Sequence, residues 1–246
     1  MTLTPPAVPR LAATIVLVRD DPFEVLLVRR HEKAVFASAL VFPGGAVDDD
    51  DDCDEWLPLL GSGVELPRNE RAIRIAGIRE VFEETGVLLA SRPDGSDVEQ
   101  PERATASFLD VVRASGGRLM LDDLHPFAHW ITPEVAPRRF DTHFLLARAP
   151  KGQQPTPDGA EIVAVEWARP ADVVRRAEHK EQPLMFPTLL NLMRLAESED
   201  AASAIAAAQN RQPYTVLAAM EIGDDGSKKV VIPAEAGYGV TEHPFP

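Results

Sequence analysis

The sequence contains almost no cysteine and has no excess of positive charge. Cys53 is the only cysteine among 246 residues. A single cysteine excludes an internal disulfide framework and a zinc site built from several thiolates, and it favours a reducing compartment, here taken as the cytoplasm. The 25 basic residues are outnumbered by 39 acidic ones, for a net charge of −14. Phosphate backbones and anionic lipids repel such a chain, so we expect neither a nucleic acid nor a membrane as partner.

Long apolar runs and metal-binding histidine patterns are also missing. The apolar run at 11–18 is too short to cross a bilayer and is not followed by a small-residue cleavage site, so it predicts a strand rather than a span or a signal peptide. The six histidines show no metal-ligand spacing, and His125 with His129 is the nearest pair. We therefore assign the histidines no role. The composition is otherwise that of a globular protein with one large or two small domains.

The negative charge is concentrated in one place. Seven carboxylates occupy positions 48–52, 54 and 55, and without them 32 acidic residues face 25 basic ones, a net charge of −7. Half of the excess is therefore local. Two roles are open for this acidic run, a flexible solvated loop or an acidic lid that concentrates cations and screens substrates by charge.

Hydrophobic periodicity predicts alternating strands and helices. A helix at 69–85 has Asn69 as its expected cap and Gly86 as its terminator. Interleaving of this kind indicates an α/β or α+β fold with helices covering the faces of a sheet. The expected strands are 13–18, 24–28, 39–42, 87–89, 127–131, 140–147, 161–167, 214–217 and 230–232, and the other expected helices are 102–114, 170–179, 184–197 and 201–209.

The stretch from Arg79 to Val87 carries the chemistry. On a helix Glu80, Glu83 and Glu84 lie at i, i+3 and i+4, so three carboxylates share one face. Like charges at this spacing repel each other, and a hard divalent cation would relieve the repulsion. Magnesium bound there could complete its coordination shell with substrate phosphate oxygens. Such a pattern alone is usually a solvated helix face, but here it follows Phe42-Pro43-Gly44-Gly45 and precedes Gly86.

This combination resembles the conserved box of the Nudix hydrolase family. The second half of the box matches at every fixed position from Arg79 to Val87. Gly45 and Arg79 lie 34 positions apart, about twenty more than in the family pattern, and the acidic run falls in this insertion. Where the family has its first glutamate, this chain has Arg71, with Glu70 beside it.

Residues 10–195 are similar to the branch of this family that has a long insertion and includes the peroxisomal coenzyme A diphosphatases of animals. The similarity includes the segments 23–30, 41–45, 130–133 and 138–142. It implies a Nudix fold, an α/β/α arrangement in which a mixed β-sheet is sandwiched between helices. The implied domain spans 8–197 with the acidic insertion at about 48–69, and 198–246 form a C-terminal extension packed on it or appended to it.

The resemblance implies hydrolysis, dependent on Mg²⁺ or Mn²⁺, of a diphosphate bond in a nucleoside diphosphate linked to another moiety. Coenzyme A or acyl-coenzyme A is the first substrate class, and ADP-ribose or NADH the second. A separate signature of coenzyme A-cleaving members expects an arginine and a glycine where this chain has Ala34 and Ser38. Both substrate classes therefore stay open. The alternative is a non-catalytic Nudix-fold sensor or binding module for nucleotides, and a homodimer is possible in either case.

Site residues follow from the resemblance. Glu83 and Glu84 are implied metal ligands, Glu80 is a ligand or the base that activates water, and the carbonyl of Gly44 is a further ligand. Arg79 is placed to orient a glutamate or neutralise its charge.

Two further roles belong to residues outside the box. The box does not fix the general base in this family, and the candidates in later loops are Glu134 and Glu161. Guanidinium groups offer phosphate a bidentate fork, so the candidates for binding substrate phosphates are Arg29, Arg30, Arg138 and Arg139.

Overall fold

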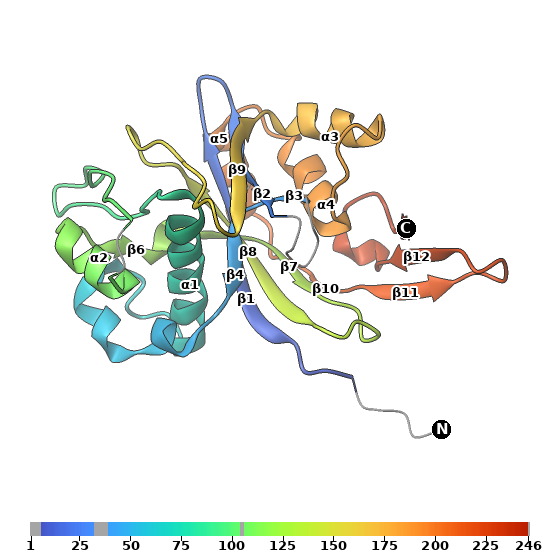
Figure 1. Cartoon of the computed structure of the whole chain (residues 1–246), viewed down its shortest axis with the longest axis horizontal. Helices are drawn as coiled ribbons and strands as arrows, with labels where there is room; N and C mark the ends of the chain where they lie inside the picture. The colour runs from blue at the N-terminus through green and yellow to red at the C-terminus, as the bar shows by residue number, and fades with distance from the viewer. Residues whose placement is uncertain (1–5, 32–38, 104–105, 246) are drawn as a thin grey trace.

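The computed structural model describes residues 6–31, 39–103 and 106–245, and Ala34 and Ser38 lie outside this part of the chain. An eight-stranded mixed sheet forms its centre (Figure 1). Its strand order is β10-β7-β8-β1-β2-β3, with β4 beside β1 and β9 beside β2. The strands are β1 (Arg10–Arg19), β2 (Glu24–Arg30), β3 (Leu40–Val41), β4 (Gly44–Ala46), β7 (His125–Ile131), β8 (Phe140–Arg148), β9 (Ile162–Ala168) and β10 (Thr215–Leu217).

Strand β1 is the axis of the sheet. It runs parallel to β8 and antiparallel to β2 and β4. Successive side chains point to opposite faces, so Ile15 and Leu17 enter one apolar cluster while Val16 and Val18 enter a second. All four are fully buried. The apolar run near the amino terminus is therefore a central strand covered on both faces.

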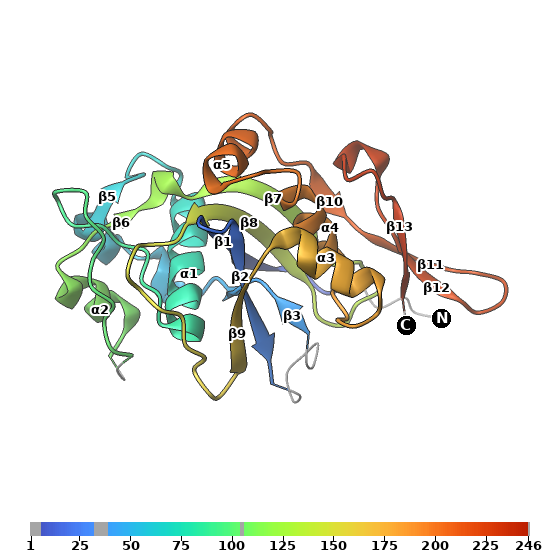
Figure 2. The same cartoon turned by 90° about the horizontal axis from the view of Figure 1, so that it is seen from above.

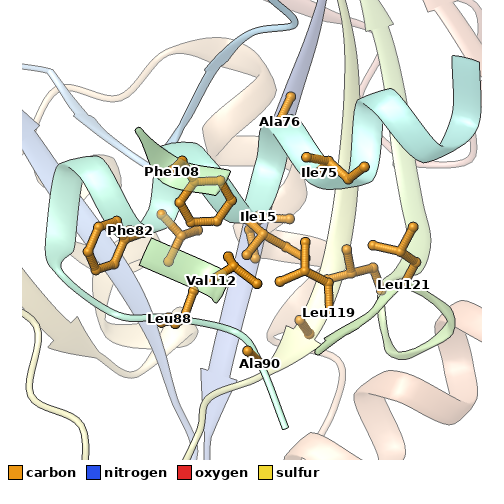
Figure 3. Close-up of a cluster of buried hydrophobic side chains, with 14 of the residues drawn as sticks. Ile15, Ile75, Ala76, Phe82, Leu88, Ala90, Phe108, Val112, Leu119 and Leu121 are labelled. Carbon is orange, nitrogen blue, oxygen red and sulfur yellow. The ribbon is translucent and has the colours of Figure 1, made fainter. Parts of the chain in front are cut away.

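Helices cover both faces of this sheet. Figures 1 and 2 show α1 (Arg68–Thr85) and α2 (Phe108–Ser115) on one side, with α3 (Pro170–Glu178) and α4 (Phe186–Leu195) on the other. On the first side Phe82 of α1 and Phe108 of α2 pack over Ile15, as Figure 3 shows. On the second side α5 (Ala201–Gln209) joins α3 and α4 in the other cluster. The predicted α/β/α sandwich is confirmed.

The acidic insertion folds against α1 and α2. It forms the 3-10 helices η1 (Asp49–Asp52) and η2 (Asp54–Leu59), and then β5 (Leu60–Ser62), which pairs with β6 (Leu119–Met120). The Trp56 ring is buried 5.5 Å from that of Phe108, and Arg68 at the start of α1 pairs with Asp52. A flexible solvated loop is therefore the wrong description of this segment, since two of its side chains, Asp51 and Trp56, are buried.

Three local predictions are wrong. The expected strand 87–89 does not form, because the Gln153 side chain accepts from the Leu88 amide and donates to its carbonyl in place of a neighbouring strand. Helix α2 begins at Phe108 and not at 102, because Ser107 caps its first turn. Asn69 lies in the first turn of α1, which starts at Arg68, and so does not cap it. The predicted terminator Gly86 does end α1, with a φ of 75° that favours glycine.

The C-terminal extension packs on the rest of the chain. Strand β10 extends the main sheet by pairing with β7, and Ala201, Ala204 and Ala208 of α5 are buried in the second cluster. Beyond them β11 (Ala219–Ile222), β12 (Lys228–Val231) and β13 (Glu242–Phe245) form a small sheet that projects from the body (Figure 1). In the described residues no helix has the length and apolar character that crossing a membrane requires.

Candidate active site

Strand β4 brings Gly44 and Gly45 under the C-terminal half of α1. The Pro43 carbonyl accepts a hydrogen bond from the Ile15 amide, and Gly44 and Gly45 then pair with β1. The Gly44 amide donates to Glu84 Oε2 over 3.0 Å. A Cβ atom added to Gly45 would lie 2.5 Å from the Glu80 carboxyl group, so only glycine allows this approach. The turn after Phe42 therefore places the backbone against two box glutamates.

Replacing Gly45 by alanine tests this contact. The added methyl group has to displace the Glu80 carboxylate, and we expect the turnover number to fall by about tenfold or more, because a small misplacement of a reacting group is costly. The half-saturating magnesium concentration should rise in the same titration. Gly116→Ala is the matched control, because a Cβ there meets no atom within 4 Å. Because residue 116 has a left-handed conformation, alanine there lowers the stability of the protein without changing the site.

Arg79 links the acidic run to the box glutamates. Its Nε and Nη2 donate to the two carboxylate oxygens of Asp51, over 2.9 and 3.0 Å. Its Nη1 donates to Glu80 Oε1 and Glu83 Oε2, both over 2.9 Å. Burial alone would lower the pKa of Arg79, but the hydrogen bonds and charge of Asp51 outweigh it and raise that pKa. Arg79 is thus a fixed cation that orients two box glutamates.

Arg30 closes the site from the other side. Its Nη2 lies 3.1 Å from both the Gly44 carbonyl oxygen and Glu84 Oε1. Its Nη1 lies 3.3 Å from Glu161 Oε1. Glu161 stands in a tight turn before β9, where the Asp158 carboxylate accepts from the backbone amides of 160–162. The structure therefore brings Arg30 and Glu161 to the box glutamates.

The neighbouring arginines do not fully compensate the negative charge of the box glutamates. Burial raises the pKa of Glu80 to about 7 against the pull of Arg79, and it raises the pKa of Glu84 to about 8 against the pull of Arg30. The neighbouring Glu161 raises both values further. Gly44 O and Glu84 Oε1, two expected metal ligands, already converge on one cationic atom, the Arg30 Nη2. An all-oxygen cluster of this kind fits a hard divalent cation such as Mg²⁺ or Mn²⁺.

The other predicted residues lie elsewhere. Glu134 and Arg138 are exposed in the turn between β7 and β8, and within the described residues no hydrogen bond or ion pair joins them to the glutamates. Arg139 is buried and donates to the carbonyl oxygens of Thr132 and Ala7, which holds that turn together. Arg29 donates to Gln182, which precedes α4. Of the four arginines, Arg30 is the one that the contacts within residues 6–31, 39–103 and 106–245 place at the glutamates.

Two residues at this site were not predicted. Asp51 is 1% exposed although it stands in a run of otherwise similar aspartates. Asp158, which fixes the turn carrying Glu161, has the signature of an Asx turn, Asp158-Gly159, immediately before a strand. The Asx-turn pattern at Asp158 is visible in the sequence and could have been used. Nothing in the sequence distinguishes Asp51 from the aspartates beside it.

Comparisons with known proteins give a consistent match. The model of the NUDT19 Nudix domain matches residues 60–195. Putative nudix hydrolase 7 of Caenorhabditis elegans is 30% identical over 200 residues, which cover 78% of this chain and 62% of that protein. Acyl-coenzyme A diphosphatase NUDT19 of Homo sapiens is 28% identical over 248 residues, 79% of this chain and 64% of that protein. The chain thus spans less than two thirds of the length of either relative.

A solved structure agrees in fold. The crystal structure of a NUDIX hydrolase from Alicyclobacillus acidocaldarius is 27% identical, with a TM-score of 0.69. The match covers 81% of this chain and 96% of that one. The similarity therefore includes nearly all of the bacterial chain, and it covers a larger share of this chain than the family model does.

Proposed function

Because this chain belongs to the Nudix hydrolase family, we propose that it hydrolyses the diphosphate bond of a nucleoside diphosphate linked to another moiety, with acyl-coenzyme A as the first substrate class. One observation supports this most strongly. In the described residues Arg79 pairs with Glu80 and Glu83, while Arg30 contacts Glu84, Glu161 and the Gly44 carbonyl oxygen. Such a cluster can hold a divalent cation and, through it, a diphosphate.

The residues that would hold the cation belong to the box and to β4. Glu83, Glu84, Glu80 and the Gly44 carbonyl would hold Mg²⁺ or Mn²⁺, which when bound would neutralise diphosphate charge and lower the pKa of a water. Arg79 fixes the orientation of the Glu80 and Glu83 carboxylates by donating a hydrogen bond to each. Arg30 releases Gly44 and Glu84 and turns to a phosphate oxygen of the substrate, since its guanidinium can make a bidentate pair there.

Glu161 is the proposed general base. The water oxygen attacks one phosphorus atom of the bridge, the bond from that phosphorus to the bridging oxygen breaks, and two phosphate monoesters leave. The water proton goes to the Glu161 carboxylate, which is half-exposed and can pass it to solvent. The Asp158 turn holds this carboxylate near the glutamates, whereas Glu134 has no such link in the described structure.

The curated relatives support acyl-coenzyme A as the first substrate class. NUDT19 of Homo sapiens carries the name acyl-coenzyme A diphosphatase. Coenzyme A joins 3′-phosphoadenosine to pantetheine through a diphosphate, so hydrolysis of that bridge gives adenosine 3′,5′-bisphosphate and 4′-phosphopantetheine. ADP-ribose and NADH contain the same bridge and form the second class.

A substrate panel tests the proposal. Coenzyme A, acetyl-coenzyme A, ADP-ribose, NADH and a dinucleoside polyphosphate are incubated with the full chain and Mg²⁺ or Mn²⁺, and products are identified by mass. We expect phosphopantetheine or its acyl form from the first two, at a higher kcat/KM than any product from the others. Hydrolysis in ¹⁸O-labelled water shows which phosphorus is attacked.

Two results would contradict the proposal in different ways. Faster cleavage of ADP-ribose or NADH would move the activity to the second substrate class. Tight binding of a nucleotide, seen as a rise in Tm, without hydrolysis under either metal would favour the sensor alternative.

We further propose that 8–246 act as one unit in the cytoplasm. The single cysteine fits a reducing compartment, and β10 of the extension pairs within the main sheet. A homodimer is the proposed assembly, and light scattering of the purified chain measures it.

A further inference from the structure

A second cluster of ligand-type side chains lies on the same face of the sheet, away from the box glutamates. His129 of β7 stands opposite His143 of β8 in the antiparallel register, and Asp141 lies two residues before His143. Residues two apart on a strand share a face, so the three side chains project together. Their ligand atoms lie within 4.8 Å of one another.

The two imidazole rings are oriented toward one carboxylate oxygen. They stack with their centroids 4.1 Å apart. His129 Nε2 contacts Asp141 Oδ1 directly, and His143 Nε2 lies 3.7 Å from the same oxygen. Ligands of a tetrahedral zinc ion are about 3.4 Å apart, so the contact between His129 and Asp141 has to open when the ion binds.

Thr215 fixes the outer side of this cluster. His129 Nδ1 lies 2.8 Å from Thr215 Oγ1, which leaves Nε2 facing Asp141. Metal-binding histidines typically use their second ring nitrogen in this way, because the bond sets the ring orientation. The side chains of the three cluster residues are 20–32% exposed, so a solvated ion can reach them. Arg74, whose charge acts on His143, is itself paired with Glu70.

From this geometry we propose that His129, Asp141 and His143 form a binding site for Zn²⁺ or a similar transition-metal ion, with an open position for water. Two imidazoles and one carboxylate suit borderline cations, whereas Mg²⁺ prefers oxygen ligands. The donor set therefore separates this site chemically from the glutamate cluster.

The two clusters are also separate in space. His143 and Gly45 both pair with Ala13, from opposite sides of β1, which places their backbones about 10 Å apart across the sheet. Gly77 of α1 packs over β1 between them, since a Cβ there would meet Ile15 and Ala13. The proposed site goes beyond the proposed function and does not depend on it.

Zinc at this site would further stabilise the packing of the C-terminal extension on the main sheet. Thr215 belongs to β10, and β10 pairs with β7 over the three residues from Thr215 to Leu217. A metal held by His129 stiffens the ring that Thr215 contacts. We expect zinc to slow proteolysis of the chain after α5 as well as to raise the Tm.

Metal retention tests the site. The untagged full chain is stripped with EDTA, incubated with ZnCl₂ and excess MgCl₂, passed over a desalting column and analysed for zinc. We expect about one zinc per chain for the wild type and for Glu83→Gln, and about none for His143→Ala or Asp141→Asn. Thr215→Val should weaken zinc binding by about tenfold. Cobalt in place of zinc should give the visible absorption of a four-coordinate nitrogen and oxygen site.

Control variants make each outcome decisive. His179→Ala removes an exposed histidine that directly follows α3, and this variant should keep its zinc. Far-ultraviolet circular dichroism of each metal-free variant shows whether it is folded. If His143→Ala is unfolded, Asp141→Asn takes its place as the test variant. Zinc retained by folded Asp141→Asn and His143→Ala, zinc lost in Glu83→Gln, or no zinc on the wild type would overturn the proposal. None of these readouts uses hydrolysis, so failure here leaves the proposed function standing.

Discussion

Glu83→Gln is expected to lower magnesium-dependent turnover by about a hundredfold or more while the protein stays folded. Glutamine keeps the shape of the side chain but removes the negative charge that would hold the cation. Because the Glu83 side chain is 51% exposed and its partner Arg79 keeps Asp51 and Glu80, the change should cost little stability. Steady-state hydrolysis at several magnesium concentrations measures the effect, and thermal unfolding checks the fold.

Glu178→Gln is the matched control for this variant. Glu178 is an exposed glutamate on α3, outside the glutamate cluster, so its turnover should equal that of the wild type. Near-wild-type hydrolysis by Glu83→Gln would remove this residue from the proposed metal site. A loss that higher magnesium fully restores would instead limit its role to the affinity for the metal.

The box helix was predictable because its signals are local. Ile75, Ile78 and Phe82 recur in the sequence at a helical spacing, and Gly86 marks the end of the helix, where the structure has a left-handed residue. The three glutamates share one side of the helix for the same reason. Periodicity and turn chemistry act within one or two turns, so the sequence carries them directly.

Contacts that depend on strand register were not predictable in this way. His129 and His143 are fourteen positions apart and meet only because β7 and β8 pair at that register. The backbone of Leu88 is satisfied by the side chain of Gln153, so an apolar run that reads as a strand forms none. In both cases the deciding partner lies far away in the chain, and no local pattern marks it.

The acidic run shows the same limit within a single segment. Asp49, Asp50 and Asp51 are chemically identical in the sequence, yet the first two are exposed and Asp51 is 1% exposed. The difference arises because η1 turns one carboxylate toward Arg79. Net charge located the segment, but the pairing with the box could only be seen in three dimensions.

Asp51→Asn is expected to be the most destabilising single change in the acidic run. Both oxygens of the buried carboxylate bind Arg79, and one also accepts from the Asp48 amide. Asparagine removes the most buried of the negative charges that compensate Arg79 and leaves Glu80 and Glu83 on its Nη1, at a cost of about 3 kcal/mol in the free energy of unfolding. Turnover should fall by about tenfold as well, because Arg79 no longer holds Glu80 and Glu83 from a fixed position.

Urea unfolding and turnover of Asp51→Asn are compared with those of Asp49→Asn, which removes the same charge from an exposed position two residues away. Equal effects of the two variants would mean that the run acts only through its total charge, as a lid would.

The pairing of Asp51 with Arg79 is tested further by adding Arg79→Met to each variant. If Asp51 and Arg79 act as a unit, Arg79→Met lowers the free energy of unfolding less in the Asp51→Asn background than in the wild type, by about 1–3 kcal/mol. Additive losses would show that the acidic insertion and the box arginine are independent.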